Sequence, residues 1–127
     1  MKKYGLPKER RITRKKIFES LVHEGRSAFA YPVKAVYLPM ELPGGVPFQV
    51  AFAVSKKRFR KAVRRNRIKR LLREAFRLNQ HALDGSRPVA VLFIYVAKEE
   101  VPFERLMQQM DKILRQIRQD LGDGATQ

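Results

Sequence analysis

The segment 61–82 constrains the fold of this chain more than any other part of the sequence. On a helical wheel its apolar side chains fall on one side, whereas its basic side chains fall on the other. The apolar side holds Ile68, Leu71, Leu72, Ala75 and Ala82, and the basic side holds Asn66, Lys69, Arg70, Arg73 and Arg77. A disordered basic tail has no reason to show two faces. The pattern therefore predicts a helix whose apolar face is buried, at roughly 1.5–3 kcal/mol for each large side chain.

Other segments predict the remaining elements. A first helix over 12–25 has Thr13 as a candidate N-cap and Gly25 as its stop. The segment 27–40 predicts a strand in which Pro32 indicates an edge or a bulge, and alternation places a set of side chains on one face. That set is Phe29, Tyr31, Val33, Ala35 and Tyr37.

Two further strands and a helix follow. Alternating apolar residues predict a strand over 48–55, and the apolar run 89–97 predicts a strand buried on both faces. The segment 101–122 has the spacing of an amphipathic helix. One sheet with helices packed on it, an α+β sandwich, is the natural outcome. We expect a single domain over 1–127, with flexible ends at about 1–7 and 122–127.

The charge of the chain indicates a polyanionic partner. The net charge is +16, and 22 of the 28 Lys and Arg residues lie in residues 1–80. Nucleic acid is the first expectation and an anionic membrane surface the second. No apolar run approaches the roughly 20 residues that span a bilayer. The sequence has no Cys, which excludes disulfides and thiol catalysis and fits a reducing cytoplasm.

The basic face of the predicted helix favours phosphate binding. Like charges four residues apart repel, and residues 42–83 contain one acid, Glu74, to relieve them. A solvated charged face is the alternative. Asn66 is a neutral amide in the middle of this face, which suits a hydrogen bond to a base edge or a sugar hydroxyl. A local cap or plain exposure is the other reading of Asn66.

Two motifs resemble a known family. The stretch "AVSKK" at 53–57, followed by "KAVRRNRIKRLLREAFR" at 61–77, is similar to the signature of the bacterial ribonuclease P protein subunit. The stretch "LPKERRITRKKIFESLVHEG" at 6–25 is similar to the N-terminal segment of that family. The resemblance implies the element order α-β-β-β-α-β-α, a mixed sheet of about four strands and a left-handed βαβ crossover.

The resemblance also implies a function. Members of the family bind a large catalytic RNA, and together they remove the 5′ leader from precursor tRNA. The RNA carries the active site and its Mg²⁺ ions, and the protein assists it and holds the leader in a cleft between the first helix and the sheet. The implied partners are therefore the catalytic RNA and the leader, in the cytoplasm, with no small-molecule substrate and no cofactor bound by the protein.

Site residues follow from the same resemblance. By position in the motifs, residues of the connector and the long helix contact the catalytic RNA, and Arg73 joins them from the basic face. These are Lys56, Lys57, Lys61, Arg65, Asn66, Arg67, Lys69, Arg70 and Arg73. Phe18 lines the leader cleft unless it is a plain core residue. Val22 stands beside it where the family often has a second aromatic residue, and Tyr37 or Tyr31 is a further candidate.

The polypeptide shows no catalytic pattern of its own. Metal-dependent cleavage of phosphodiesters needs clustered carboxylates, and here the acids are scattered. His23 and His81 are isolated, so neither has a partner in the sequence for acid–base chemistry. We therefore expect no catalytic residue and no metal site on the protein. A ribosomal protein or an RNA chaperone has the same charge, size and fold class, and a duplex-DNA binder is a further competitor.

Overall fold

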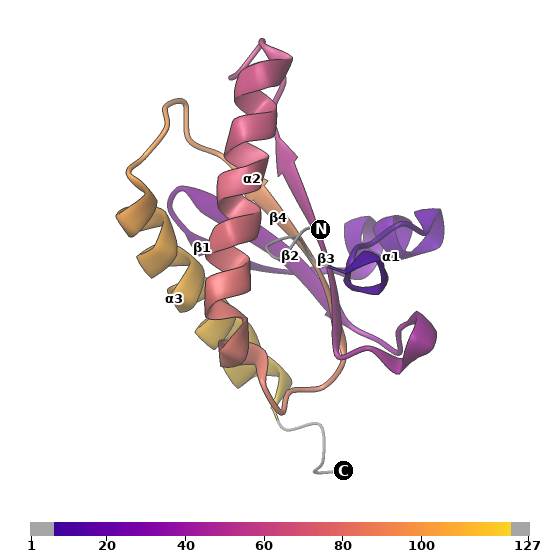
Figure 1. Ribbon diagram of the computed structural model, residues 1–127. Coiled ribbons are helices and arrows are strands. Elements are labelled where there is room, and N and C mark those ends of the chain that lie inside the picture. Colours follow the sequence, from indigo (N-terminus) through magenta and orange to yellow (C-terminus); the bar gives the residue numbers. More distant parts are fainter. Residues whose placement is uncertain (1–6, 123–127) are drawn as a thin grey trace.

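In the described part of the chain, four strands form one mixed sheet, and helices cover both of its faces (Figure 1). The computed structural model describes residues 7–122. In chain order the elements are η1 (Lys8–Arg10), α1 (Lys15–Glu24), β1 (Arg26–Ala30), β2 (Val33–Pro39), η2 (Pro43–Gly45), β3 (Phe48–Val54), α2 (Ala62–Asn79), η3 (Gln80–Leu83), β4 (Val89–Tyr95) and α3 (Phe103–Leu121). This is the expected α+β order α-β-β-β-α-β-α.

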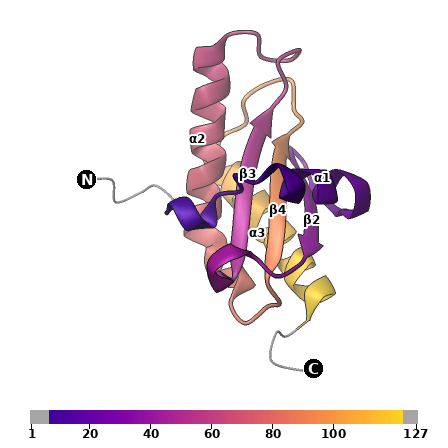
Figure 2. The ribbon, with the colours of Figure 1, turned by 90° about the vertical axis from the view of Figure 1, so that its right-hand side faces the viewer.

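The order of the strands in the sheet is β1-β2-β4-β3. β2 is antiparallel to both of its neighbours, whereas β3 and β4 are parallel and are joined through α2. In Figure 2 the two parallel strands point upward, β4 lies to the right of β3, and α1 lies in front of the sheet, whereas α2 packs on the opposite face, away from the viewer. The crossover is therefore left-handed, as expected, although most parallel crossovers are right-handed.

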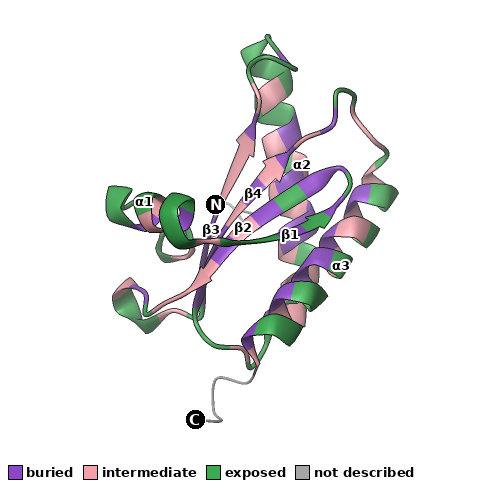
Figure 3. Ribbon diagram, turned by 180° about the vertical axis from the view of Figure 1, so that it is seen from behind, coloured by how far each residue is buried: buried purple, intermediate pink, exposed green. Residues whose placement is uncertain are grey.

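The larger core lies between the sheet and the helices α2 and α3. Phe76 of α2 is fully buried there, and its ring lies 5.2 Å from that of Phe48 on β3 and 5.4 Å from that of Phe93 on β4. A smaller core on the opposite face packs Ile17 and Leu21 of α1 against the sheet. Figure 3 shows the buried side of each helix turned toward the sheet.

The long basic helix has the predicted buried face. Ile68, Leu72 and Ala75 are buried, and Leu71 packs at the edge of the larger core. The helix is shorter than the predicted range 61–82, because α2 ends at Asn79 and the chain continues as the 3-10 turn η3.

The segment 27–40 is not the single strand that alternation predicts. It is a hairpin, in which β1 and β2 turn at Tyr31 and Pro32 and pair with Ala30 opposite Val33. Val33 and Tyr37 point into the larger core, whereas Phe29 is exposed and does not share their face. Alternation of apolar residues looks the same on either side of a tight turn, so it did not reveal this reversal.

Two smaller predictions concern the ends of elements. Thr13 is not the N-cap of the first helix, because α1 begins at Lys15 with Arg14 at the cap position and no side-chain cap bond. The predicted flexible ends, about 1–7 and 122–127, lie outside the described residues except for Pro7 and Gly122. Between Pro7 and the start of α1, the N–H of Ile12 donates to the carbonyl oxygen of Val50 over 3.0 Å. This bond holds the N-terminal segment against the outer edge of β3.

Candidate nucleic-acid interface

The connector between β3 and α2 is an ordered basic loop. Its one buried side chain is Phe59, whose ring lies 6.0 Å from that of Tyr95 in the larger core. The N–H of Phe59 donates to the carbonyl oxygen of Ser55, which closes a turn. The cations on either side are exposed, namely Lys56, Lys57, Arg58, Arg60 and Lys61. In the sequence this stretch reads only as a basic connector. In the structure the buried ring of Phe59 anchors it to the core, and the flanking cations face solvent.

Arg65 ties the connector to the helix. Its guanidinium donates from Nη1 to the carbonyl oxygens of Phe59 and Arg60, both at 2.8 Å. Part of the hydrogen-bonding capacity of Arg65 is therefore used inside the protein. Its predicted contact with RNA stays a prediction, and the structure adds a role in fixing the shape of the loop.

Glu100, in the loop before α3, holds two arginines of α2. The Arg64 guanidinium lies 3.3 Å from the Glu100 carboxylate, and that of Arg67 lies 3.6 Å from it. The sequence analysis did not single out Glu100. No local signal could have found it, because the contact joins segments more than 30 residues apart.

The first turns of α2 carry an exposed surface. Asn66, Arg67 and Arg70 are exposed, Lys69 is half-buried, and Val63 is 80% exposed among the cations. In Figure 1 this end of α2 extends beyond the sheet. The outer surface of the connector and this end of the helix, residues 56–70, is called the basic platform below.

Arg73 extends the basic platform toward the edge of β3. Its guanidinium lies 5.8 Å from the ring centre of Phe52. Burial lowers the pKa of Arg73 below its ordinary value, and the charges of Arg11 and Arg70 lower it further. Arg11 and Arg73 also line one pocket of about 160 Å³ with Phe52 at its wall. Clustered guanidinium groups that repel one another favour binding of an anion, and Arg binds phosphate oxygens bidentately.

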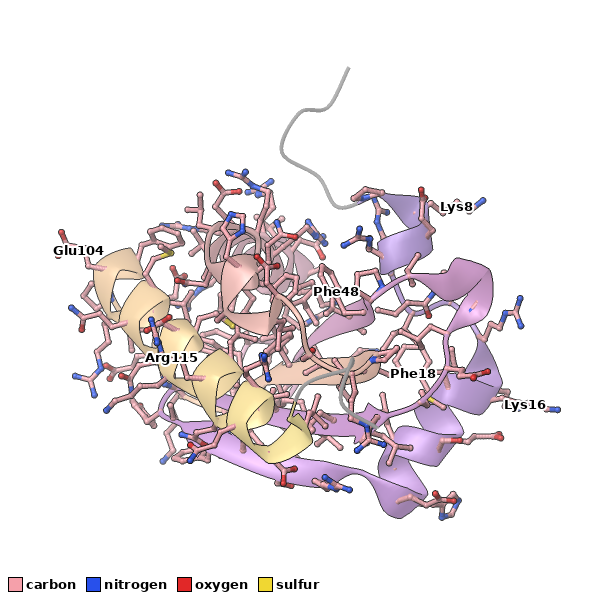
Figure 4. The ribbon with its side chains drawn as sticks, turned by 90° about the horizontal axis from the view of Figure 1, so that it is seen from below. Lys8, Lys16, Phe18, Phe48, Glu104 and Arg115 are labelled. Carbon is pink, nitrogen blue, oxygen red and sulfur yellow. The ribbon has the colours of Figure 1, made fainter. Side chains whose placement is uncertain are left out.

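Phe18 and Val22 lie on α1, one turn apart. Phe18 is half-buried and packs with the smaller core, so it is not a fully buried core residue, and its place in a leader cleft stays a prediction. Figure 4 shows Phe18 between α1 and the sheet. Val22 is 77% exposed and offers an aliphatic surface without a ring.

Tyr37 does not belong to a cleft beside α1, which corrects the sequence-based placement. Its side chain is only 5% exposed and lies in the larger core on the opposite face of the sheet. Its hydroxyl donates to Asp120 of α3 over 2.8 Å. Tyr31 lies in the hairpin turn, where its carbonyl oxygen accepts a hydrogen bond from Gln109 of α3.

The acidic groups of the described residues do not assemble a metal site. Within residues 7–122 there is no group of three or more His, Asp or Glu side chains that could hold an ion. Glu74 accepts two hydrogen bonds from Arg77, which lower its pKa, and His81 lies 3.5 Å from Asp84 at the surface. Over the same residues, no helix is long and apolar enough to cross a membrane.

Comparisons of sequence show which family the chain belongs to. The sequence model of a family described as Ribonuclease P matches residues 6–118. The Ribonuclease P protein component of Porphyromonas gingivalis is 35% identical over 119 residues, which cover 90% of this chain and 87% of that protein. The protein of the same description from Desulfovibrio desulfuricans is 33% identical, with coverage of 95% of this chain and 92% of that protein.

Comparisons of structure give the same fold. The RNase P protein of Staphylococcus aureus superposes with a TM-score of 0.70 at 20% identity, covering 87% of this chain and 97% of that one. The RNase P protein of Thermotoga maritima also gives a TM-score of 0.70, at 23% identity, covering 84% of this chain and 96% of that one.

Proposed function

Because this chain belongs to the bacterial ribonuclease P protein family, we propose that its basic platform binds the catalytic RNA of the enzyme. We further propose that the α1 face of the sheet holds the 5′ leader of precursor tRNA. The chain is the protein component of an endoribonuclease that acts in tRNA processing. Cleavage of the leader takes place on the RNA subunit, in the cytoplasm, with Mg²⁺ held through the RNA.

The observation that carries this proposal is the organisation of the cations. Phe59 and Arg65 fix the connector from inside, so that its lysines and arginines point away from the core. The same surface continues along α2 to Arg73 and reaches Arg11 across the pocket at the edge of β3. An extended surface of fixed cations fits the phosphate backbone of a folded RNA.

Binding of the leader requires a surface that differs from the basic platform. Leaders vary in sequence, so contacts that tolerate any base are needed, and stacking on an aromatic ring supplies them. Phe18 on α1 is half-buried beside the sheet, which supports it as one such ring. The part of the sheet that α1 leaves uncovered would then lie beside the bound leader.

Reconstitution with the catalytic RNA tests the proposal. Purified protein is added to bacterial ribonuclease P RNA and precursor tRNA at low Mg²⁺, and cleavage and substrate affinity are measured. We expect both to rise, and the gain in affinity to disappear with mature tRNA, which has no leader. If the protein raises neither, the assignment to the RNA and the leader is wrong.

A salt titration separates this function from binding of duplex DNA. Affinity for the catalytic RNA and for a DNA duplex of equal charge is measured over the same range of salt. A clear preference for the RNA is expected if the platform recognises the shape of the folded catalytic RNA and not only its charge. Equal affinities at every salt concentration would favour a general polyanion binder.

A further inference from the structure

The sheet face toward α1 consists of rows of side chains that run across the strands. In one row Lys34 of β2 pairs with Phe29 of β1 on one side and with Ile94 of β4 on the other. Ile94 pairs in turn with Ala53 of β3. These four residues, Phe29, Lys34, Ile94 and Ala53, are called the outer row.

α1 covers the neighbouring row and leaves the outer row uncovered. Two residues along each strand, Val36, Leu92 and Ala51 pack with α1 in the smaller core. Side chains two residues apart point to the same face of a sheet, so the outer row lies on this face too. No residue of the outer row belongs to that core, and Phe29 and Lys34 are exposed. Figure 2 shows β3 and β4 rising beyond α1 at this end.

The outer row has a distinct chemical feature at each end. At the β1 end stands the ring of Phe29, which is 55% exposed. At the β3 end, Ala53 lies two residues before Ser55 and the basic platform. Three strand spacings separate the ends, roughly 14 Å. The row therefore has an exposed ring beside a lysine at one end, and the basic platform follows in the chain from its other end.

This combination fits a single strand of RNA. An exposed ring offers a surface to any base, and a lysine beside it can contact the phosphate of the same strand. We propose that Phe29 is a second stacking platform for the leader, and that Lys34 binds a phosphate next to the stacked base. The inference rests on the proposed function, because it takes the occupant of this sheet face to be the leader.

The position of Phe29 implies a contact with the leader that is distinct from that of Phe18. Val22 of α1, one turn from Phe18, is exposed but has no ring. Phe29 lies on the edge strand β1, outside the smaller core against which Phe18 packs, and would contact a different nucleotide. Leaders too short to reach β1 would then gain nothing from Phe29, whereas they would still contact Phe18.

Leader length provides the first test. Holoenzyme is assembled with wild-type, Phe29→Leu or Phe18→Ala protein, and affinity is measured for precursor tRNAs with leaders of increasing length. Phe29→Leu keeps an apolar side chain but removes the ring. We expect it to weaken binding of long leaders by about five- to hundredfold and to leave the shortest leaders unchanged. The control is Leu78→Ala, which truncates an exposed side chain at the C-terminal end of α2.

The outcomes separate the two proposals. If Phe18→Ala weakens leader binding but Phe29→Leu has no effect at any length, the leader site stands and the platform on β1 is wrong. If neither variant alters leader binding, the leader proposal itself fails. A Phe29→Leu effect that is equal for mature tRNA, or that lowers affinity for the catalytic RNA, also overturns the inference, because the ring would then touch another partner.

Fluorescence gives a direct second test. The sequence contains no Trp, so Phe29→Trp introduces a single indole at the platform, and Leu78→Trp introduces one far from it. Stacking of a base on the indole is expected to quench the emission of the first variant when a long-leader substrate binds, but not when mature tRNA binds. Leu78→Trp should respond equally to both substrates. An unquenched Trp at position 29, in a variant that binds the leader normally, contradicts the stacking contact.

Discussion

The hydroxyl of Tyr37 donates a hydrogen bond to the carboxylate of Asp120 over 2.8 Å, linking β2 to the last turn of α3. Asp120 also accepts a hydrogen bond from Arg26 at 2.8 Å, and both donors lower its pKa. Because Tyr37 lies on the α3 side of the sheet, we expect Tyr37→Phe to lower the free energy of unfolding by about 1 kcal/mol. Urea denaturation measures this loss. Leader affinity should not change, and a selective loss of leader binding would contradict the placement of Tyr37.

The same bond predicts a dependence of stability on alkaline pH. Burial, together with the bond to Asp120, raises the pKa of Tyr37 to about 12 from an ordinary value of 10.0. On raising the pH, the unfolded chain therefore loses this proton before the folded protein does, so the stabilisation is complete below pH 10 and is lost between about pH 10 and 12. Denaturation curves over this range should show a smaller alkaline loss for Tyr37→Phe than for wild type. The variant Tyr31→Phe, at an exposed tyrosine, is the control.

Gly25 is required where α1 meets β2. A Cβ atom at this position would collide with the carbonyl oxygen of Leu21 and lie 2.5 Å from a methyl carbon of Val36. Gly25→Ala should therefore displace the end of α1 from the sheet and cost about 1–3 kcal/mol of stability. The unfolding temperature and the affinity for the leader are measured, and both should fall.

A second glycine gives the matched control for this prediction. Gly44 has a φ of 74°, but a Cβ there would meet no atom within 4 Å. Gly44→Ala should cost about 1–2 kcal/mol through backbone strain alone and leave leader affinity unchanged. Equal leader affinity in the two variants would show that the position of α1 does not govern the leader site.

The parts of this fold that the sequence predicts are those with a local period. The burial of Ile68 and Leu72 follows from helical spacing, because every third or fourth residue of a helix meets the same neighbour. The hairpin at Pro32 and the pairing of Arg64 with Glu100 have no such period. They depend on which segments meet in space, and the placement of Tyr37 was wrong for the same reason.

The basic platform predicts a specific effect of salt. Arg70 is exposed on α2, and half-buried Lys69 lies beside it in the chain. Arg70→Ala and Lys69→Ala should each weaken binding to the catalytic RNA and reduce the log–log salt slope by roughly 0.7–0.9 for each phosphate that the variant no longer binds. Arg115→Ala removes a charge from α3, where Arg115 pairs with Asp111, and serves as the control. An unchanged slope in the α2 variants would rule out direct binding of phosphate there.

Arg65 predicts a link between the order of the connector and RNA binding. Arg65→Ala removes the donor to the carbonyl oxygens of Phe59 and Arg60. We expect faster amide exchange and faster tryptic cleavage across 56–61. The loss of RNA affinity should also be larger than the loss caused by removing a single phosphate-binding charge. Arg65→Lys keeps the charge but not the pair of bonds from Nη1, so it should retain the salt slope while the loop becomes less ordered. Unchanged exchange in both variants would show that the loop is fixed without Arg65.

Removing the charge of Glu100 should strengthen RNA binding, whereas the preceding substitutions should weaken it. Its carboxylate lies 3.3 Å from the Arg64 guanidinium and 3.6 Å from that of Arg67, so it neutralises part of the charge on the platform. Glu100→Gln should tighten binding to the catalytic RNA at low salt and steepen the salt slope, because both arginines become available to phosphate. Stability should change by less than about 1 kcal/mol, since the two arginines are largely exposed.

Filter binding of the variant holoenzyme across a salt series measures this effect, with Asp111→Asn on α3 as a matched removal of one acid. Asp111 pairs with Arg115 over 2.9 Å, away from the platform, so its substitution adds the same charge without releasing Arg64 or Arg67. Equal gains in the two variants would assign the effect to net charge alone. Weaker binding by Glu100→Gln would instead mean that the carboxylate orients the two arginines toward the RNA, and that this orientation outweighs the charge it neutralises.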